Sequence, residues 1–175
     1  DARIEVQHAA IGGVRGVIGA QTSRSDFAAV GAESFIPESR TEKRALFLVE
    51  EYVAGAWRFE GALRQEWQEA SAVGLPDVEH KPFSISGAAV WHFTPGWSGA
   101  VSLSRSQRAP SAQELYADGV HLATNTYEIG DSSLDVETAN SIELTLRKTE
   151  GALTGSVSAY HYVYDDYIFA RTLDQ

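Results

Sequence analysis

The side chains best suited to chemistry lie between residues 109 and 137, a stretch that combines carboxylates, tyrosines and a histidine. A neutral imidazole is a good zinc ligand, and carboxylates bind zinc through oxygen. His121 is therefore the sharpest candidate metal ligand, and Asp118 and Glu128 are close enough in sequence to share a site with it. Six residues in all are candidates for ligand binding: Tyr116, Asp118, His121, Tyr127, Glu128 and Asp131. The competing interpretation is a solvent-exposed or packed loop histidine among ordinary loop tyrosines.

This stretch connects two segments that alternate between apolar and polar side chains, residues 101–106 before it and 141–147 after it. Period-two alternation is typical of a strand with one apolar and one polar face. A connection of roughly thirty residues is far longer than the ~2–5 residues of an ordinary hairpin loop. Long loops of this kind are usually functional, so we expect the candidate binding residues to form a capture loop.

Enzymatic catalysis is not indicated by the sequence. No nucleophile is accompanied by a base and an orienting acid, and no two carboxylates are paired as a glycosidase requires. Gly12 and Gly13 match a hairpin turn and lack a phosphate-binding pattern. We therefore expect no catalytic residues and no prosthetic group.

The composition narrows the class of protein. The chain has 175 residues, a net charge of −10, and neither cysteine nor methionine. Disulfides and thiolate metal sites are excluded, and the negative charge argues against nucleic-acid binding. No run of ~18 apolar residues could form a transmembrane helix, whereas each strand of a transmembrane β-barrel needs only alternation over ~9–11 residues.

The alternation recurs along the chain and predicts an all-β fold of antiparallel up-and-down strands, about eight in four hairpins. We expect strands at about 3–9, 14–25, 44–53, 57–68, 84–93 and 153–169, besides the two that frame the long loop. Short turns at 11–13, 54–56, 94–97 and 149–152 alternate with long connections at about 26–43, 69–83 and 109–137. That order is typical of outer-membrane barrels, in which short turns face the periplasm and long loops face outside.

In a barrel the two faces of these strands have different surroundings. The polar faces are expected to line a water-filled interior with Arg15, Arg58, Arg64, Arg105, Arg147, His92 and His161. Aromatic residues near the strand ends suit an interfacial girdle: Trp57, Trp67, Trp91, Phe93 and Trp97. The alternative is a soluble all-β sandwich that buries the same rings in a core.

Within this pattern, a gapped motif resembles the TonB-dependent outer-membrane receptors. The family's Arg-x-Pro-x-x-x-Glu-Leu-[Tyr/Phe] element ends a barrel strand, and a Gly-[Asp/Asn]-x-x-Leu-x-x-Glu-[Thr/Lys] element precedes the next one. The matching residues are Arg108, Pro110, Glu114, Leu115 and Tyr116, then Gly130, Asp131, Leu134, Glu137 and Thr138. Residues 119–131 are most similar to the zinc-uptake branch of the family.

The resemblance implies that residues 1–175 are part of a larger transmembrane β-barrel of ~22 strands. We expect the segment to come from the C-terminal half, with the plug domain and the final strands outside it. The implied protein is a monomeric receptor of the bacterial outer membrane that contacts lipid and the TonB complex, the latter through the plug. Its implied cargo is a metal ion or metal chelate, with zinc favoured. The alternatives are a siderophore, haem, cobalamin or saccharide receptor, a passive porin, or a soluble binding module.

Overall fold

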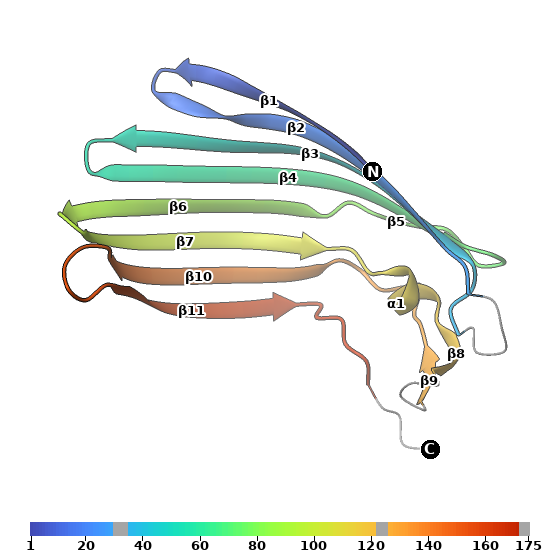
Figure 1. Ribbon diagram of the computed structural model, residues 1–175. Coiled ribbons are helices and arrows are strands. Elements are labelled where there is room, and N and C mark those ends of the chain that lie inside the picture. The colour runs from blue at the N-terminus through green and yellow to red at the C-terminus, as the bar shows by residue number, and fades with distance from the viewer. Residues whose placement is uncertain (30–34, 122–125, 172–175) are drawn as a thin grey trace.

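The computed structural model describes residues 1–29, 35–121 and 126–171, and most of them belong to one curved antiparallel sheet (Figure 1). Its strands lie in the order β1-β2-β3-β4-β6-β7-β10-β11, and the short β5 also pairs with β4. The bounds are β1 (Ala2–Ile11), β2 (Val14–Phe27), β3 (Ser39–Ala54), β4 (Trp57–Ala72), β5 (Val78–His80), β6 (Phe83–Thr94), β7 (Trp97–Arg108), β10 (Glu137–Lys148) and β11 (Gly155–Asp165). The predicted all-β, up-and-down fold of four hairpins is confirmed, and the strands do not form the two packed layers of a sandwich.

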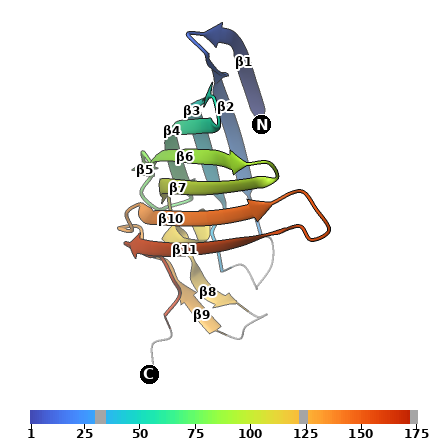
Figure 2. The ribbon, with the colours of Figure 1, turned by 90° about the vertical axis from the view of Figure 1, so that its left-hand side faces the viewer.

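The long connection between β7 and β10 contains the helix α1 (Ala112–Tyr116) and a separate hairpin of β8 (Asp118–His121) and β9 (Thr126–Ile129). Figure 1 shows the short turns at one end of the sheet and the long connections, with α1, β8 and β9, at the other. The edge-on view in Figure 2 shows the curvature of the sheet. Across residues 1–29, 35–121 and 126–171, no helix has the length and apolar character needed to cross a membrane.

The observed bounds of β3, β4 and β11 differ by several residues from the predicted ones. β3 begins at Ser39 instead of near residue 44, because residues 39–43 pair with the end of β2, where Phe27 is opposite Ser39. These residues are polar on both faces, so their composition resembles a loop although their backbone continues the ladder. β4 likewise extends to Ala72. β11 ends at Asp165, and the next residue, Asp166, has a positive φ of 53° that is incompatible with a strand.

The register sorts the side chains into an apolar face and a polar face. On the apolar face, cross-strand partners include Phe59 with Ala89, Ala89 with Val101, and Val101 with Leu144. The polar face holds ion pairs such as Arg15 Nε to Glu51 Oε1 at 2.8 Å and hydroxyl contacts such as Ser104 to Ser141 at 2.7 Å. This division matches the expected lipid-facing and interior faces of a barrel wall.

Two residues predicted for the interior lie on the apolar face instead. Arg105 is opposite Ile85 on β6 and Asn140 on β10, in phase with Leu103. His161 is opposite Ile142. Their charge or polarity suggested the interior, but alternation along each strand determines the face. The interior prediction is therefore wrong for both of them.

An aromatic belt follows the short-turn end of the apolar face. Trp57 stacks on Trp91 with ring centroids 5.4 Å apart, and the series continues through Phe93 to Trp97. Lys148 lies 5.4 Å from the centre of the Trp97 ring. Trp67 lies at the far end of β4 from this belt. The arrangement agrees with the predicted girdle, because aromatic rings that are partly apolar and partly polar suit a membrane interface.

On the polar face, Gly19 provides the space for a stacked pair. The ring of Phe47 from β3 lies directly over the backbone of Gly19, and the Arg3 guanidinium covers the ring at 4.3 Å from its centre. Any side chain at residue 19 would overlap Phe47.

We expect Gly19→Val to lower the free energy of unfolding by about 1–3 kcal/mol, because Phe47 has to leave its position. Denaturant unfolding of the whole receptor in detergent measures the change. Gly61→Val is the matched control, since a Cβ there meets no atom within 4 Å. Equal losses for the two variants would contradict this account of Gly19.

Candidate functional site

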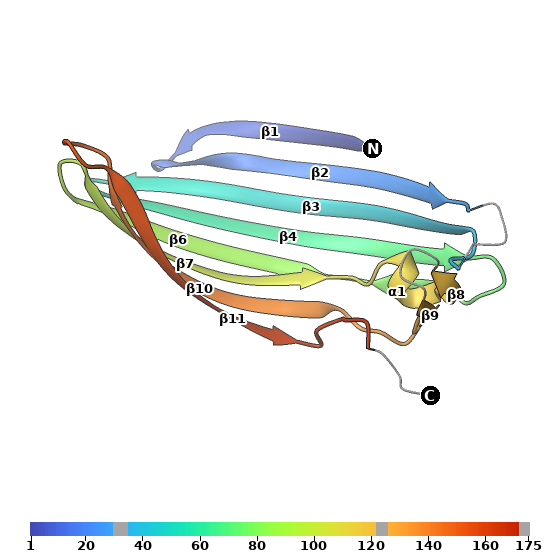
Figure 3. The same ribbon diagram turned by 60° about the horizontal axis from the view of Figure 1, so that its bottom comes forward.

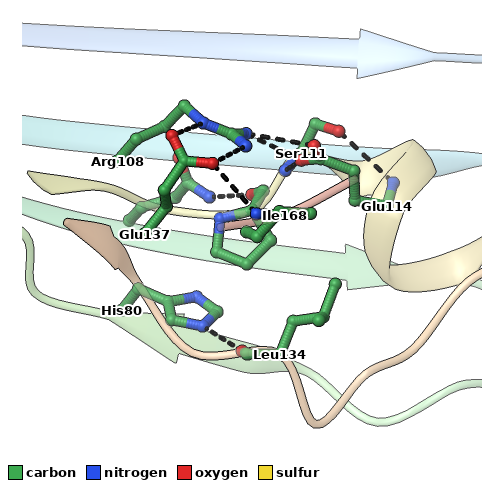
Figure 4. A network of polar contacts seen from close by, with 9 residues as sticks. His80, Arg108, Ser111, Glu114, Leu134, Glu137 and Ile168 are labelled. Carbon is green, nitrogen blue, oxygen red and sulfur yellow. Dashed lines mark hydrogen bonds and ion pairs between the residues drawn. The ribbon is translucent and has the colours of Figure 1, made fainter. Parts of the chain in front are cut away.

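The long connection is fixed to the sheet at its two ends by Arg108, the last residue of β7. Its guanidinium donates to Glu114 Oε2 on α1 at 2.9 Å and to Glu137 Oε2 at the start of β10 at 3.2 Å. Arg108 and Glu137 are also cross-strand partners. Figure 4 shows the guanidinium between the two carboxylates, and Glu137 also accepts from the Ile168 amide at 3.0 Å. One cation therefore joins two strands and the helix.

The short helix α1 begins with a capping box. The Ser111 side chain accepts from the Glu114 amide at 3.3 Å, and Glu114 accepts from the Ser111 amide at 2.7 Å. Burial opposes ionisation of Glu114, but the hydrogen bonds from Arg108 and Ser111 hold the pKa of its carboxyl below the ordinary value of 4.5. The motif residues Arg108 and Glu114 thus have a structural role at the base of the loop.

Tyr116 is buried where α1 packs against the end of β4. Only 3% of it is exposed, and its hydroxyl donates to the carbonyl oxygens of Ala70 at 2.7 Å and Pro76 at 3.0 Å. Leu115 packs into the same small cluster with Ala70 and Ala72. Tyr116 was predicted as a substrate contact, but in this position it holds the loop and presents no ring surface to a ligand.

The β8–β9 hairpin brings His121 and Glu128 together. His121 Nδ1 lies 2.7 Å from Glu128 Oε1, and the other carboxylate oxygen accepts from Gln113 Nε2 at 2.9 Å. The His121 ring also stacks on Phe35 at 4.5 Å between centroids (Figure 3 shows where the hairpin lies relative to α1). Hydrogen bonds from Gln113 and then His121 lower the pKa of Glu128 below its ordinary value.

Asp118 and Tyr127 lie on the opposite face of this hairpin. The register pairs Asp118 with Ile129 and Gly119 with Glu128, so Asp118 alternates away from Glu128. Asp118 Oδ1 accepts from the Tyr127 hydroxyl at 2.8 Å, and this bond raises the pKa of the phenol. Tyr127 is 61% exposed and is available to a ligand in solution.

Asp131 belongs to the turn that leaves the hairpin. It accepts from the Ser133 amide and hydroxyl at 2.8 and 2.6 Å, and these bonds lower its pKa. The preceding Gly130 packs against the end of α1, where a Cβ would come within 2.6 Å of backbone atoms of Leu115 and Tyr116. These contacts give Gly130 and Asp131 a structural role at the end of the hairpin.

The candidate zinc ligands His121, Asp118 and Glu128 are therefore not assembled as a trio. His121 and Glu128 share one face, and Asp118 is on the other. Within the described part of the chain, no group of three or more His, Asp or Glu side chains is placed to hold a metal ion. The participation of these residues in metal binding stays a prediction.

Sequence reasoning did not identify three residues that shape this region. Gln113 orients Glu128, Phe35 stacks on His121, and His80 Nε2 contacts the Leu134 carbonyl oxygen at 2.9 Å (Figure 4). A helical pattern in residues 112–116 could have drawn attention to Gln113 as a residue of a short helix beside the candidate ligands. Phe35 comes from another connection, between β2 and β3, and had no signal in the sequence.

Tyr116→Phe should loosen the loop without unfolding the sheet. The variant leaves two backbone carbonyls without this donor, at a cost of about 1 kcal/mol. We expect amide hydrogen exchange in α1 and β8–β9 to accelerate by about fivefold, with unchanged exchange in β3 and β4. Tyr127→Phe is the control, because it removes a solvent-exposed hydrogen bond from the Tyr127 hydroxyl to Asp118 and should leave exchange in α1 unchanged. Unchanged exchange in α1 would contradict the anchoring role of Tyr116.

Acid should release the same loop. Because the folded pKa of Glu114 is lowered, its stabilising contribution is complete above its ordinary pKa of 4.5 and is lost as pH falls through the folded value. Exchange in α1, corrected for intrinsic rates, should therefore rise as the pH falls below the ordinary pKa of 4.5. Glu114→Gln should show faster exchange already at neutral pH. A flat profile in the native receptor would contradict the prediction.

The comparison with known families agrees with this geometry. A family model described as "TonB dependent receptor-like, beta-barrel" matches residues 4–175. Proteins with this domain lie in the outer membrane of Gram-negative bacteria, interact with TonB and transport ligands. Because the match covers nearly the whole chain, this chain belongs to the TonB-dependent receptor family.

Proposed function

We propose that this receptor takes up a metal ion or a metal chelate, with zinc favoured, and that the β8–β9 hairpin captures it. The observation that carries the proposal is the contact between His121 and Glu128 on one face of the hairpin. Imidazole nitrogen and carboxylate oxygen are both ordinary zinc ligands, and zinc usually takes four. The hairpin would supply two, which leaves two positions for water, an organic chelator or other segments of the receptor.

The surroundings of this pair support a capture role. Gln113 holds one oxygen of Glu128, as outer hydrogen bonds commonly orient metal-binding carboxylates. Phe35 restricts the orientation of the His121 ring by stacking. Glu128 is ionised at neutral pH, as the direction of its pKa shift reinforces, so no proton has to leave it when a cation binds. The anchored base of the loop keeps this hairpin at the long-loop end of the barrel wall.

Transport would then follow from the general action of the family. The captured cargo would pass to the interior, and the TonB complex would supply energy through the plug domain. The chain described here would act as barrel wall and capture loop, with no catalytic residue and no prosthetic group. A siderophore, haem or cobalamin cargo is the alternative within the same family.

Zinc titration by calorimetry of the whole receptor in detergent tests the proposal. We expect His121→Ala to weaken binding by at least about tenfold, the effect of losing one good ligand contact, and Glu128→Gln to weaken it similarly. Asp118→Asn should stay within about twofold, because Asp118 is on the other face of the hairpin. His8→Ala, on strand β1, is the matched histidine control.

Each result has a definite meaning. Weaker zinc binding by both His121→Ala and Glu128→Gln, with unchanged zinc affinity in Asp118→Asn and His8→Ala, supports zinc capture by this hairpin. Tight binding that is unaffected by either change would place the zinc site elsewhere. No zinc binding by the intact receptor would refute zinc as cargo and favour a chelate, to be tested with siderophores, haem and cobalamin.

A further inference from the structure

The apolar face carries a shallow groove between β6 and β11. It has a volume of about 730 Å³, and most of its lining residues alternate onto this face. Gly87 and Ala89 form a low floor on β6, while Leu103 and Ile142 border the groove from β7 and β10. An apolar groove of this kind, on a face turned towards lipid, has the shape and chemistry to hold an acyl chain.

Polar groups occur at the outer part of this groove. Arg105 and Asn140 are cross-strand partners in the row that also contains Ile85 and Val163. His161 lies in the adjacent row, opposite Ile142. These polar groups are unexpected on an apolar face. For Arg105 and His161, the charge or polarity of the side chain predicted the interior face, and that prediction is wrong.

Arg105 is exposed, and its guanidinium makes no hydrogen bond or ion pair with any group in residues 1–29, 35–121 and 126–171. In the next row, the carboxylate of Asp165 accepts from Asn140 Nδ2 at 3.3 Å. By contrast, arginines such as Arg15 and Arg64 on the polar face are paired with Glu51 and Glu66. The guanidinium of Arg105 therefore offers its donors to a group outside the sheet.

The height of Arg105 matches a membrane interface. Trp97, in the aromatic belt, and Arg105 are both on β7, and eight residues of a tilted strand climb about 20 Å. The apolar band of an outer-membrane barrel is ~25 Å tall, so Arg105 lies near its outer border, where an arginine is far less costly than at the middle of the bilayer. Trp67 likewise lies on the apolar face, at the end of β4 that is far from the aromatic belt. Phosphate groups of lipids lie at this level, and guanidinium binds phosphate through parallel hydrogen bonds.

We propose that this groove binds a membrane lipid with a phosphorylated headgroup. An acyl chain lies along Gly87 and Ala89, and the headgroup phosphate accepts hydrogen bonds from Arg105, with Asn140 and His161 beside it. The site shares no residue with the capture hairpin and does not depend on the identity of the transported cargo.

The test is a binding titration of the whole receptor, delipidated in a zwitterionic detergent, with lipid A that carries two phosphates. Arg105→Gln should weaken binding by about tenfold, as expected for the loss of a charge-assisted contact, and Arg105→Lys should retain part of it. Arg147→Gln is the matched control, because Arg147 is an exposed arginine on the polar face of β10, opposite Ser98. Gly87→Leu, which fills the groove, should also weaken binding.

Further measurements distinguish binding of the lipid from binding of free phosphate, and this site from the proposed zinc site. Lipid A without its phosphates should bind the unchanged receptor weakly, and excess inorganic phosphate should not compete. Unchanged affinity in Arg105→Gln, or equal binding of the dephosphorylated lipid, would overturn the proposal. Full competition by inorganic phosphate would show an anion site only and would overturn it too. Zinc titration of Arg105→Gln should match that of the unchanged receptor, so failure here is distinguishable from failure of the proposed cargo.

Discussion

The register of the large sheet is the constraint on which the other features depend. Side chains alternate between two faces, so a shift of one residue in any ladder would move a whole strand's apolar set to the interior. The observed ladders keep Trp57 opposite Trp91 on one face and Ser104 opposite Ser141 on the other. Irregularities in pairing occur near the short turns, between His8 and Ile11 and between Trp91 and Thr94. The faces stay separate along the rest of the wall.

At the other end of the sheet, the register also fixes the base of the capture loop. Because Arg108 and Glu137 are cross-strand partners, the two ends of a long connection meet at one point, and Glu114 adds the helix to that point. An exposed ion pair alone contributes little. Here one guanidinium contacts two carboxylates and the helix cap reinforces it, which restricts a loop whose closure otherwise costs conformational entropy. The hairpin can then extend from a fixed base.

Much of this arrangement could be predicted from the sequence, because alternation and turn residues act locally. The four hairpins and the order of short and long connections followed from them. The sequence could not predict that Asp118 lies on the opposite face of the hairpin from His121 and Glu128. β8 and β9 have only four residues each, and their side chains show no clear alternation. The burial of Tyr116 depends on Ala70 and Pro76, far away in the chain. For Arg105, the phase set by Leu103 indicated the correct face, but the charge of the side chain suggested the other.

The charge distribution makes the two proposed sites physically independent. With a net charge of −10, the chain as a whole repels phosphate and attracts cations. Charges in contact with water are screened over about 8 Å at physiological salt, so the groups nearest to each site decide what it attracts. Glu128 and Asp118 make the hairpin locally acidic. Arg105 lies in a row with the uncharged Ile85, Asn140 and Val163, and the Asp165 carboxylate in the next row is hydrogen-bonded to Asn140. A cation at the hairpin and a phosphate at the outer border of the groove are thus each favoured locally, at two sites that share no residue.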